Sequence, residues 1–175
     1  MMRSGGSQPV FRRFVCAVGV GAALAATSGC TVPVDAVAGI SVSGDGHLLG
    51  VMMVCGHRID GASLYVRSAD PDKRVASWTA DQALQPGLTT WTLDSPAAGW
   101  VATGPSAPLT AGANYTLYGW TKDNSWSSAS VSFTLADRDQ LTPGNVRYID
   151  LSVAGHASAV TVPVAEFEAK ACHRS

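Results

Sequence analysis

Charge is scarce in this sequence. Charged residues make up 14% of the 175 residues, against about 25% in an average soluble domain. Lysine and arginine together number 12 and aspartate and glutamate 13, so the net charge is −1. A basic nucleic-acid-binding protein and an acidic disordered chain are therefore both excluded. Hydrophobic residues make up 46% of the chain, which is enough for one domain with a hydrophobic core.

The sequence signatures of common enzymes are also missing. The chain has no Gly-x-Ser-x-Gly, His-Glu-x-x-His or Cys-x-x-Cys motif and no glycine-rich phosphate loop. Its only glutamates, Glu166 and Glu168, lie near the C-terminus, where we expect them to be solvated. His57 and Asp60 are close enough in the chain to form an ion pair within a loop. We therefore expect no catalytic residues, no metal and no cofactor, and a protein that is not an enzyme.

No apolar run is long enough to span a membrane as a helix. The run near the N-terminus covers residues 14–26, whereas a membrane-spanning helix needs about 20 apolar residues. It follows Arg3, Arg12 and Arg13 and precedes small residues, which is the pattern of a secretory signal peptide. We expect a signal peptide over residues 1–29. Export would follow the general route or, as the Arg12–Arg13 pair suggests, the twin-arginine route.

The expected signal peptide is followed by a cysteine, in the order Thr27-Ser28-Gly29-Cys30. These residues resemble the lipobox of bacterial prolipoproteins, with Thr27 standing where leucine is usual. The resemblance implies that Cys30 carries diacylglycerol and palmitate and anchors the mature chain to the cell membrane on its extracytoplasmic side. Residues 30–37 are then a lipidated N-terminus and tether. The alternative is ordinary cleavage after Ala25, which leaves Cys30 as a free thiol.

The number of cysteines agrees with this interpretation. Of the four cysteines, Cys16 leaves with the signal peptide and Cys30 takes the lipid, so Cys55 and Cys172 remain. An even pair in an exported domain predicts one disulfide bond between them. The alternative is two unpaired buried thiols.

Residues 38–175 show the alternation that is typical of β-strands. The clearest example is residues 128–135, where Val131, Phe133 and Leu135 alternate with serine and threonine. Eight or nine such segments recur at a spacing of roughly 8–12 residues, and no long segment has a helical period. The sequence therefore predicts an all-β domain, an antiparallel β-sandwich, with a β-barrel as the alternative. A short terminal helix near residues 166–171 is also compatible with the pattern.

One local pattern sharpens the expected fold. Leu109, Gly112 and Tyr115 have the spacing of the tyrosine corner and resemble immunoglobulin-like and fibronectin type III domains. The resemblance implies that the Tyr115 hydroxyl bonds back to the backbone of the preceding loop. About forty residues follow Leu135, more than such a domain needs, and we expect them to add strands that Cys172 ties to the strand ending at Cys55. A chain of this build also resembles small lipoproteins of actinobacteria, which implies no activity.

Tryptophan is the most suggestive residue type in the chain. All five indoles lie in the mature part, at residues 78, 91, 100, 120 and 126. Exposed indoles can stack on sugar rings or anchor protein interfaces. We expect four of them in the core and one, Trp126 in a hairpin turn, at the surface. Trp126, Trp120 and Tyr118 are the candidate ligand-binding residues.

Two functions are compatible with these features. The first is a lipid-anchored interaction or scaffold module that binds a protein of the bacterial cell envelope. The second is a module that binds carbohydrate or glycolipid through exposed tryptophans. Either would have the membrane and an envelope component as partners, and neither involves nucleic acid.

Overall fold

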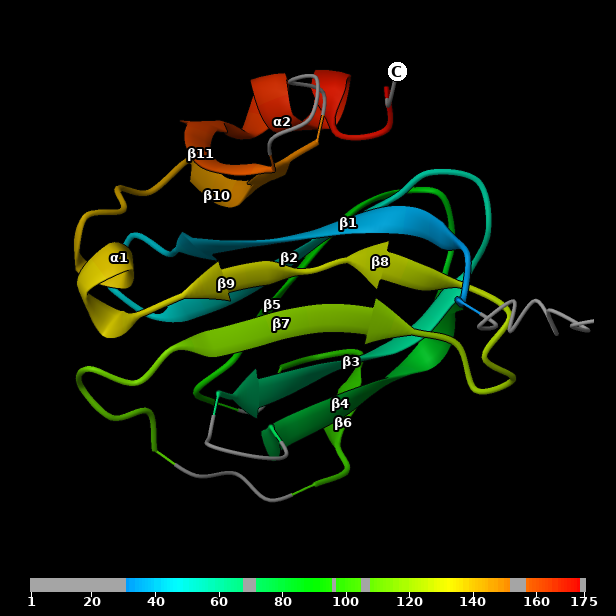
Figure 1. The fold of residues 1–175 in the computed structure, drawn as a ribbon, viewed down its shortest axis with the longest axis horizontal. Coiled ribbons are helices and arrows are strands. Elements are labelled where there is room, and N and C mark those ends of the chain that lie inside the picture. The colour runs from blue at the N-terminus through cyan, green and yellow to red at the C-terminus, as the bar shows by residue number, and fades with distance from the viewer. Residues whose placement is uncertain (1–30, 68–71, 96, 105–107, 152–156, 174–175) are drawn as a thin grey trace, which may run out of the picture. The chain divides into compact units, whose positions relative to one another are not determined.

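The computed structural model describes residues 31–67, 72–95, 97–104, 108–151 and 157–173 (Figure 1). The expected signal peptide and Cys30 lie outside these residues. The described residues form eleven strands and two short helices, so the predicted all-β class is confirmed. The helices are α1 (Leu135–Asp139) and α2 (Val164–Lys170). The strands are β1 (Val34–Val42), β2 (Leu48–Val54), β3 (Ile59–Val66), β4 (Lys73–Leu84), β5 (Gly87–Thr92), β6 (Trp100–Ala102), β7 (Tyr115–Trp120), β8 (Ser127–Ala129), β9 (Val131–Phe133), β10 (Asn145–Asp150) and β11 (Ser158–Pro163).

Two layers of strands enclose the main core. One layer pairs β1 with β2 and β2 with β5, both antiparallel. The other contains β8 and β9, then β7, β3, β4 and β6, again with antiparallel neighbours. A parallel pairing of β1 with β8 joins the layers along one edge, so that all eleven strands belong to one continuous sheet. The fold has the two layers of the predicted sandwich and, along this edge, the continuous hydrogen bonding of the barrel alternative.

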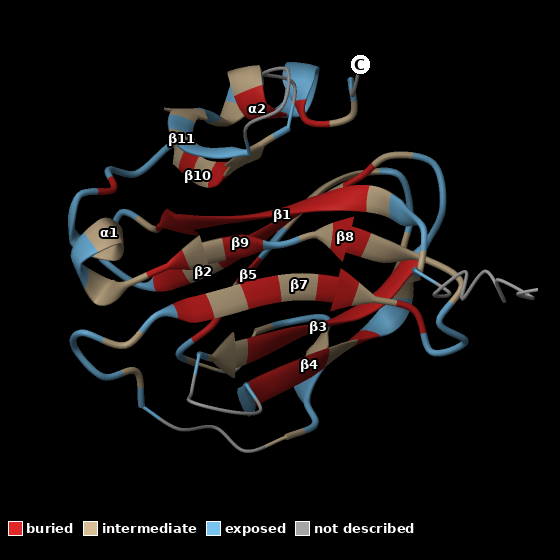
Figure 2. Ribbon diagram, viewed as in Figure 1, coloured by how far each residue is buried: buried red, intermediate tan, exposed pale blue. Residues whose placement is uncertain are grey.

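Alternation along the strands decides which side chains enter the core. Ala36, Ala38 and Ile40 of β1 are fully buried in the main core, whereas Val37 between them belongs to a second cluster on the opposite side. This is the two-residue period of a strand, in which successive side chains point to opposite faces. Figure 2 shows β1 buried over most of its length, while β7 alternates between buried and half-buried residues.

The chain after α1 forms the extension that the sequence predicts. β10 pairs with β1 and β11, and α2 follows β11. Phe167 of α2 is fully buried and lies against Tyr148 of β10, with 4.9 Å between ring centroids. Together with the outward-facing Val37 and Val51 they make a second hydrophobic core. The extension therefore covers the outer face of the β1–β2 layer.

A disulfide bond joins Cys55, directly after β2, to Cys172, just after α2. The two residues are 117 positions apart in sequence and their Cα atoms are 5.4 Å apart. The predicted pairing is confirmed, and the alternative of two free thiols is wrong. The bond holds the end of the extension against the end of β2.

The tyrosine corner has the geometry that the resemblance implies. The Tyr115 hydroxyl accepts a hydrogen bond from the backbone N–H of Thr110 at 2.8 Å. Gly112 adopts a positive φ of 77°, a conformation that favours glycine, and turns the chain between them. Tyr115 itself is buried in the main core.

Two boundaries differ from the predicted ones. The predicted tether at 30–37 is too long, because β1 begins at Val34 and Val37 is already buried. The strand predicted to reach Leu135 ends at Phe133, because Leu135 is already the first residue of α1. The reason is a capping box: the Thr134 hydroxyl accepts a hydrogen bond from the N–H of Asp137, whose carboxylate accepts from the N–H of Thr134.

Candidate functional site

Four aromatic side chains lie on the outer face of the layer that contains β7 and β3. We call Tyr65, Tyr118, Trp120 and Trp126 the aromatic face. All four are partly exposed, whereas their neighbours on the strands point into the core. They line two adjoining hollows of about 380 and 460 Å³, which share Tyr118 and Trp120. The three residues predicted from the sequence, Tyr118, Trp120 and Trp126, therefore lie together, and the structure adds Tyr65.

The indole of Trp120 lies flat against the sheet. Its Nε1–H donates to Oγ of Ser63 on the neighbouring strand at 3.0 Å. A Cβ atom placed on Gly61 would lie 2.5 Å from Cζ2 of the ring, so only glycine leaves room for the indole there. One side of the indole is thus packed on β3, and the partly exposed remainder faces both hollows.

The indole of Trp126 is held in place by a histidine ring that stacks on it. The rings of His57 and Trp126 are stacked, with 3.7 Å between centroids and 14° between planes. The Asp35 carboxylate accepts hydrogen bonds from the backbone N–H of His57 and contacts its Nδ1. The ion pair predicted between His57 and Asp60 is therefore wrong. Asp60 is buried instead and accepts a hydrogen bond from the backbone N–H of Lys122 at 2.9 Å.

The loop from Thr121 to Trp126 has a dense set of internal hydrogen bonds. The backbone N–H of Trp126 donates to the buried hydroxyl of Thr121 at 3.0 Å. Asp123 accepts hydrogen bonds from the hydroxyl and the N–H of Ser125 and pairs with Arg58 at 2.8 Å. The hydrogen bonds from Ser125 hold the pKa of Asp123 well below its usual value, and the Arg58 charge adds to the effect. These contacts hold the backbone of the loop that carries Trp126.

Tyr65 and Tyr118 stack at the other end of the face, with 5.8 Å between ring centroids. Burial, with the hydrogen bond to Tyr65 acting in the same direction, raises the pKa of Tyr118 to about 12. The phenol is therefore neutral at physiological pH and can donate a hydrogen bond. Arg74, Lys122 and Asn124 add polar groups to the wall of the same hollow.

The expected division of the tryptophans, four in the core and one at the surface, is wrong. Trp78 and Trp91 are buried, but Trp100, Trp120 and Trp126 are all partly exposed. Trp100 lies outside the two hollows and stacks on Trp91 at 4.4 Å, where it covers the edge of the core. The alternation along β3 places Tyr65 on the opposite face from Leu64, so Tyr65 could have been found from the sequence. Nothing in the sequence pointed to Asn124 or Arg74.

Comparison with protein-family models, curated proteins and solved structures returned no match. Neither helix of the described chain is long and apolar enough to cross a membrane. Within the same described ranges, no three histidine, cysteine, aspartate or glutamate side chains gather where they could hold a metal ion. The aromatic face is therefore judged on its own geometry.

Proposed function

We propose that this protein is a carbohydrate-binding module of the bacterial cell envelope and that the aromatic face is its binding surface. The observation that carries the proposal is the presence of Trp120, Trp126 and Tyr118 side by side along two adjoining hollows. The C–H faces of sugar rings are apolar and stack on aromatic rings, while their hydroxyls need polar partners. Both kinds of group line the hollows.

The rigid placement of the rings supports the same function. Trp120 is fixed by Ser63, and Trp126 is fixed by His57 and Thr121. A ligand would then lose little binding energy in ordering these side chains. Two adjoining shallow hollows, rather than one deep one, suit a chain of several sugar units better than a single sugar.

We also propose that a lipid on Cys30 anchors the module on the extracytoplasmic side of the cell membrane. The Cys55–Cys172 disulfide supports an oxidising compartment outside the cytosol. Thr31 and Val32 line the second hollow, and Thr31 is bonded directly to Cys30. An anchor at Cys30 would therefore place the hollow close to the bilayer, within reach of membrane-proximal glycans or glycolipid head groups.

An interaction or scaffold module has less support from the surface. Its large exposed apolar side chains are Val34, Val101 and Leu151 in the parts of the chain that the structure describes. Val34 and Leu151 lie at neighbouring ends of β1 and β10, but Val101 lies on β6 at the far end of the strand order, so the three do not form one large patch of the kind that a protein interface needs.

The direct test is binding of the purified chain to polysaccharides and glycolipids extracted from bacterial envelopes, measured by affinity electrophoresis and calorimetry. We expect Trp120→Ala and Trp126→Ala to weaken binding about tenfold or more, as loss of a central aromatic anchor does. Trp100→Ala is the matched control, because Trp100 is also partly exposed but lies outside the hollows. Absence of binding to every glycan, or an equal loss in the control, would contradict the proposal.

The anchor has a separate test. Mass spectrometry of the mature chain expressed in a bacterial host should find an acylated Cys30 at its N-terminus. An unmodified N-terminus at Ala26 would contradict lipidation and leave the binding proposal untouched.

A further inference from the structure

A second cavity lies on the other side of the layer from the aromatic face. It has a volume of about 400 Å³ and is half-enclosed. Leu64 and Ala76, which pair across β3 and β4, form part of its wall. Leu64 points into the core while the next residue, Tyr65, belongs to the aromatic face. The two sites therefore use opposite faces of the same strands and share no lining residue.

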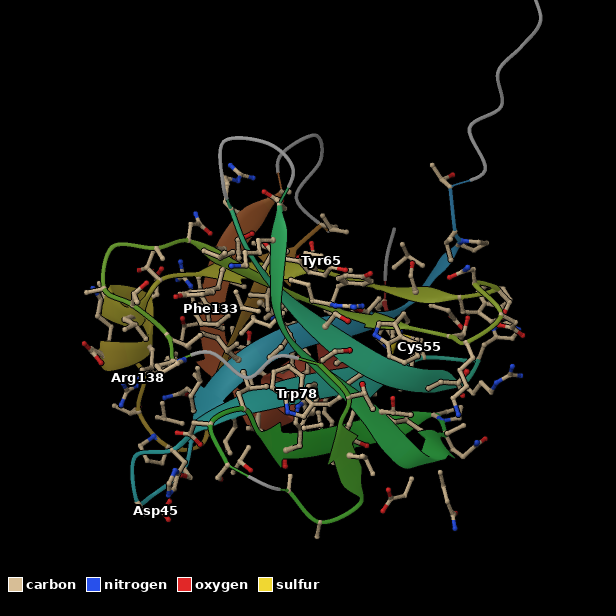
Figure 3. The ribbon with its side chains drawn as sticks, turned by 90° about the horizontal axis from the view of Figure 1, so that it is seen from below. Asp45, Cys55, Tyr65, Trp78, Phe133 and Arg138 are labelled. Atoms are coloured by element: carbon tan, nitrogen blue, oxygen red, sulfur yellow. A yellow bond between two sulfur atoms is a disulfide. The ribbon has the colours of Figure 1, made fainter. Side chains whose placement is uncertain are left out.

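The cavity opens at the end of the domain farther from Thr31. Leu48, in its wall, pairs with Val42, the last residue of β1. β1 starts at Val34, so the cavity and the N-terminal end of the strand are separated by most of a nine-residue strand, or roughly 25 Å at ~3.3 Å per residue. Figure 3 shows Arg138, which also lines the cavity, on the side of Asp45 and away from Cys55.

Most residues that line the cavity are apolar, and the other two carry one charge of each sign. Leucines at positions 48, 64, 93, 109 and 135, with Ala76 and Pro108, provide the apolar surface. The two charged lining residues are Asp94 and Arg138. Asp94 contacts Nδ1 of His47 at 3.2 Å, and Arg138 has a long ion pair of 3.7 Å with its neighbour Asp139. Both are about 40% exposed or more, so both groups can reach a ligand at the opening.

We propose that this cavity binds a small amphiphile with one apolar chain or ring and a polar head of zero net charge. The volume lies in the roughly 300–1,000 Å³ range of small-molecule sites and has room for about a dozen water-sized groups at ~30 Å³ each. Apolar walls take the chain because its removal from water is favourable. A head that both donates and accepts hydrogen bonds satisfies Asp94 and Arg138 together, whereas an ionic head of either sign pairs with one of them and is repelled by the other.

The test compares three amphiphiles of equal chain length on the full chain, below their micelle concentrations. Monodecanoylglycerol has an uncharged head, decanoate an anionic one and decyltrimethylammonium a cationic one. Calorimetry should give the tightest binding for monodecanoylglycerol, with each ion weaker by roughly fivefold, the effect of one exposed charge. Asp94→Asn should restore decanoate binding and Arg138→Gln should restore decyltrimethylammonium binding. Equal affinities for all three would contradict the assigned head group.

Filling the cavity tests the site itself. Ala76→Phe places a ring in the cavity and should abolish binding of monodecanoylglycerol, and Leu109→Trp, at another lining position, should do the same if the first variant fails to fold. Ala159→Phe, at an exposed position of β11, is the matched control and should bind like the native chain. Trp126→Ala should also bind normally, which separates this site from the aromatic face. No binding to the native chain, or unchanged binding in a folded Ala76→Phe or Leu109→Trp variant, would overturn the proposal.

Discussion

The two layers of this domain have very different outer faces. Outside β1 and β2, the side chains of Val37 and Val51 are buried under β10, β11 and α2. Outside β7 and β3, Tyr118, Trp120 and Tyr65 remain partly exposed, although they are larger and would release more water if they were covered. The C-terminal extension therefore covers the face with the smaller side chains. The proposed binding function would account for the aromatic face being left open.

The polar contacts of the two faces differ in the same way. The covered face is built mainly from aliphatic side chains, with the rings of Phe167 and Tyr148 among them. The open face uses tyrosine and tryptophan, and the indole N–H of Trp120 donates to Ser63. Such side chains tolerate water at one end and apolar contact at the other, which is the requirement of a surface that stacks against a sugar.

Removing the disulfide should have the largest effect, and it should fall on the covered face. Cys55→Ser with Cys172→Ser opens a loop of more than 100 residues, for which chain-entropy models give about 4–5 kcal/mol. The free energy of unfolding, measured in guanidinium chloride, should drop by about that amount. If glycan binding of the still-folded variant falls as well, the two faces are not independent.

Truncating one aromatic on each face should separate stability from binding. Phe167→Ala leaves a cavity in the second core and should cost about 3 kcal/mol of unfolding free energy, with little change in glycan affinity. Trp126→Ala should cost only about 1 kcal/mol and should remove most of the binding. Thermal and denaturant unfolding, together with calorimetry, would measure both. A loss of binding in Phe167→Ala that matches Trp126→Ala would break the distinction.

A pair of glycines gives a finer comparison. A Cβ on Gly61 would meet Trp120 and the Trp78 carbonyl at 2.5 Å, and a Cβ on Gly39 would meet Val146 at 2.6 Å. Each substitution by alanine should cost about 2 kcal/mol through crowding. Gly61→Ala should also shift Trp120 and weaken glycan binding, whereas Gly39→Ala should leave binding unchanged. Identical binding in both variants would show that the position of Trp120 does not matter.

The smallest expected effect concerns the ionisation of Tyr118 on the aromatic face. The folded chain raises the pKa of Tyr118 to about 12 through burial and the contact with Tyr65. A raised pKa favours the protonated phenol in the folded state, so this contribution to stability is complete below about pH 10 and is lost as the pH rises through about 12. Absorbance titration of phenolate should show one tyrosine fewer ionising near pH 12 in Tyr118→Phe. An unchanged titration curve would contradict the assigned environment.

Much of this fold could be predicted from the sequence because its signals are local. The two-residue period predicts the strands, the spacing of Leu109, Gly112 and Tyr115 predicts the corner, and the cysteine count predicts the disulfide. The prediction failed where the contact that decides the structure was distant or where two patterns competed. Asp35, which contacts His57, lies 22 residues away, and the Thr134–Asp137 capping box overrides the strand pattern at Leu135.

The candidate site was predicted in part for a related reason. Both faces of β7 carry aromatic residues, Tyr115 on one and Tyr118 with Trp120 on the other, so alternation alone does not say which face is outside. The cavity near Arg138 could not be predicted, because its wall combines six segments that are far apart in the sequence.

The central claim is that the open aromatic face binds glycan, and indole NMR tests it most directly. Each of the five tryptophans gives one Nε1–H signal, which single-tryptophan variants assign. On titration with a bound envelope glycan, we expect the signals of Trp120 and Trp126 to shift together, while those of Trp78, Trp91 and Trp100 stay in place. Shifts confined to the latter three, or no shift at any indole under saturating glycan, would contradict the account.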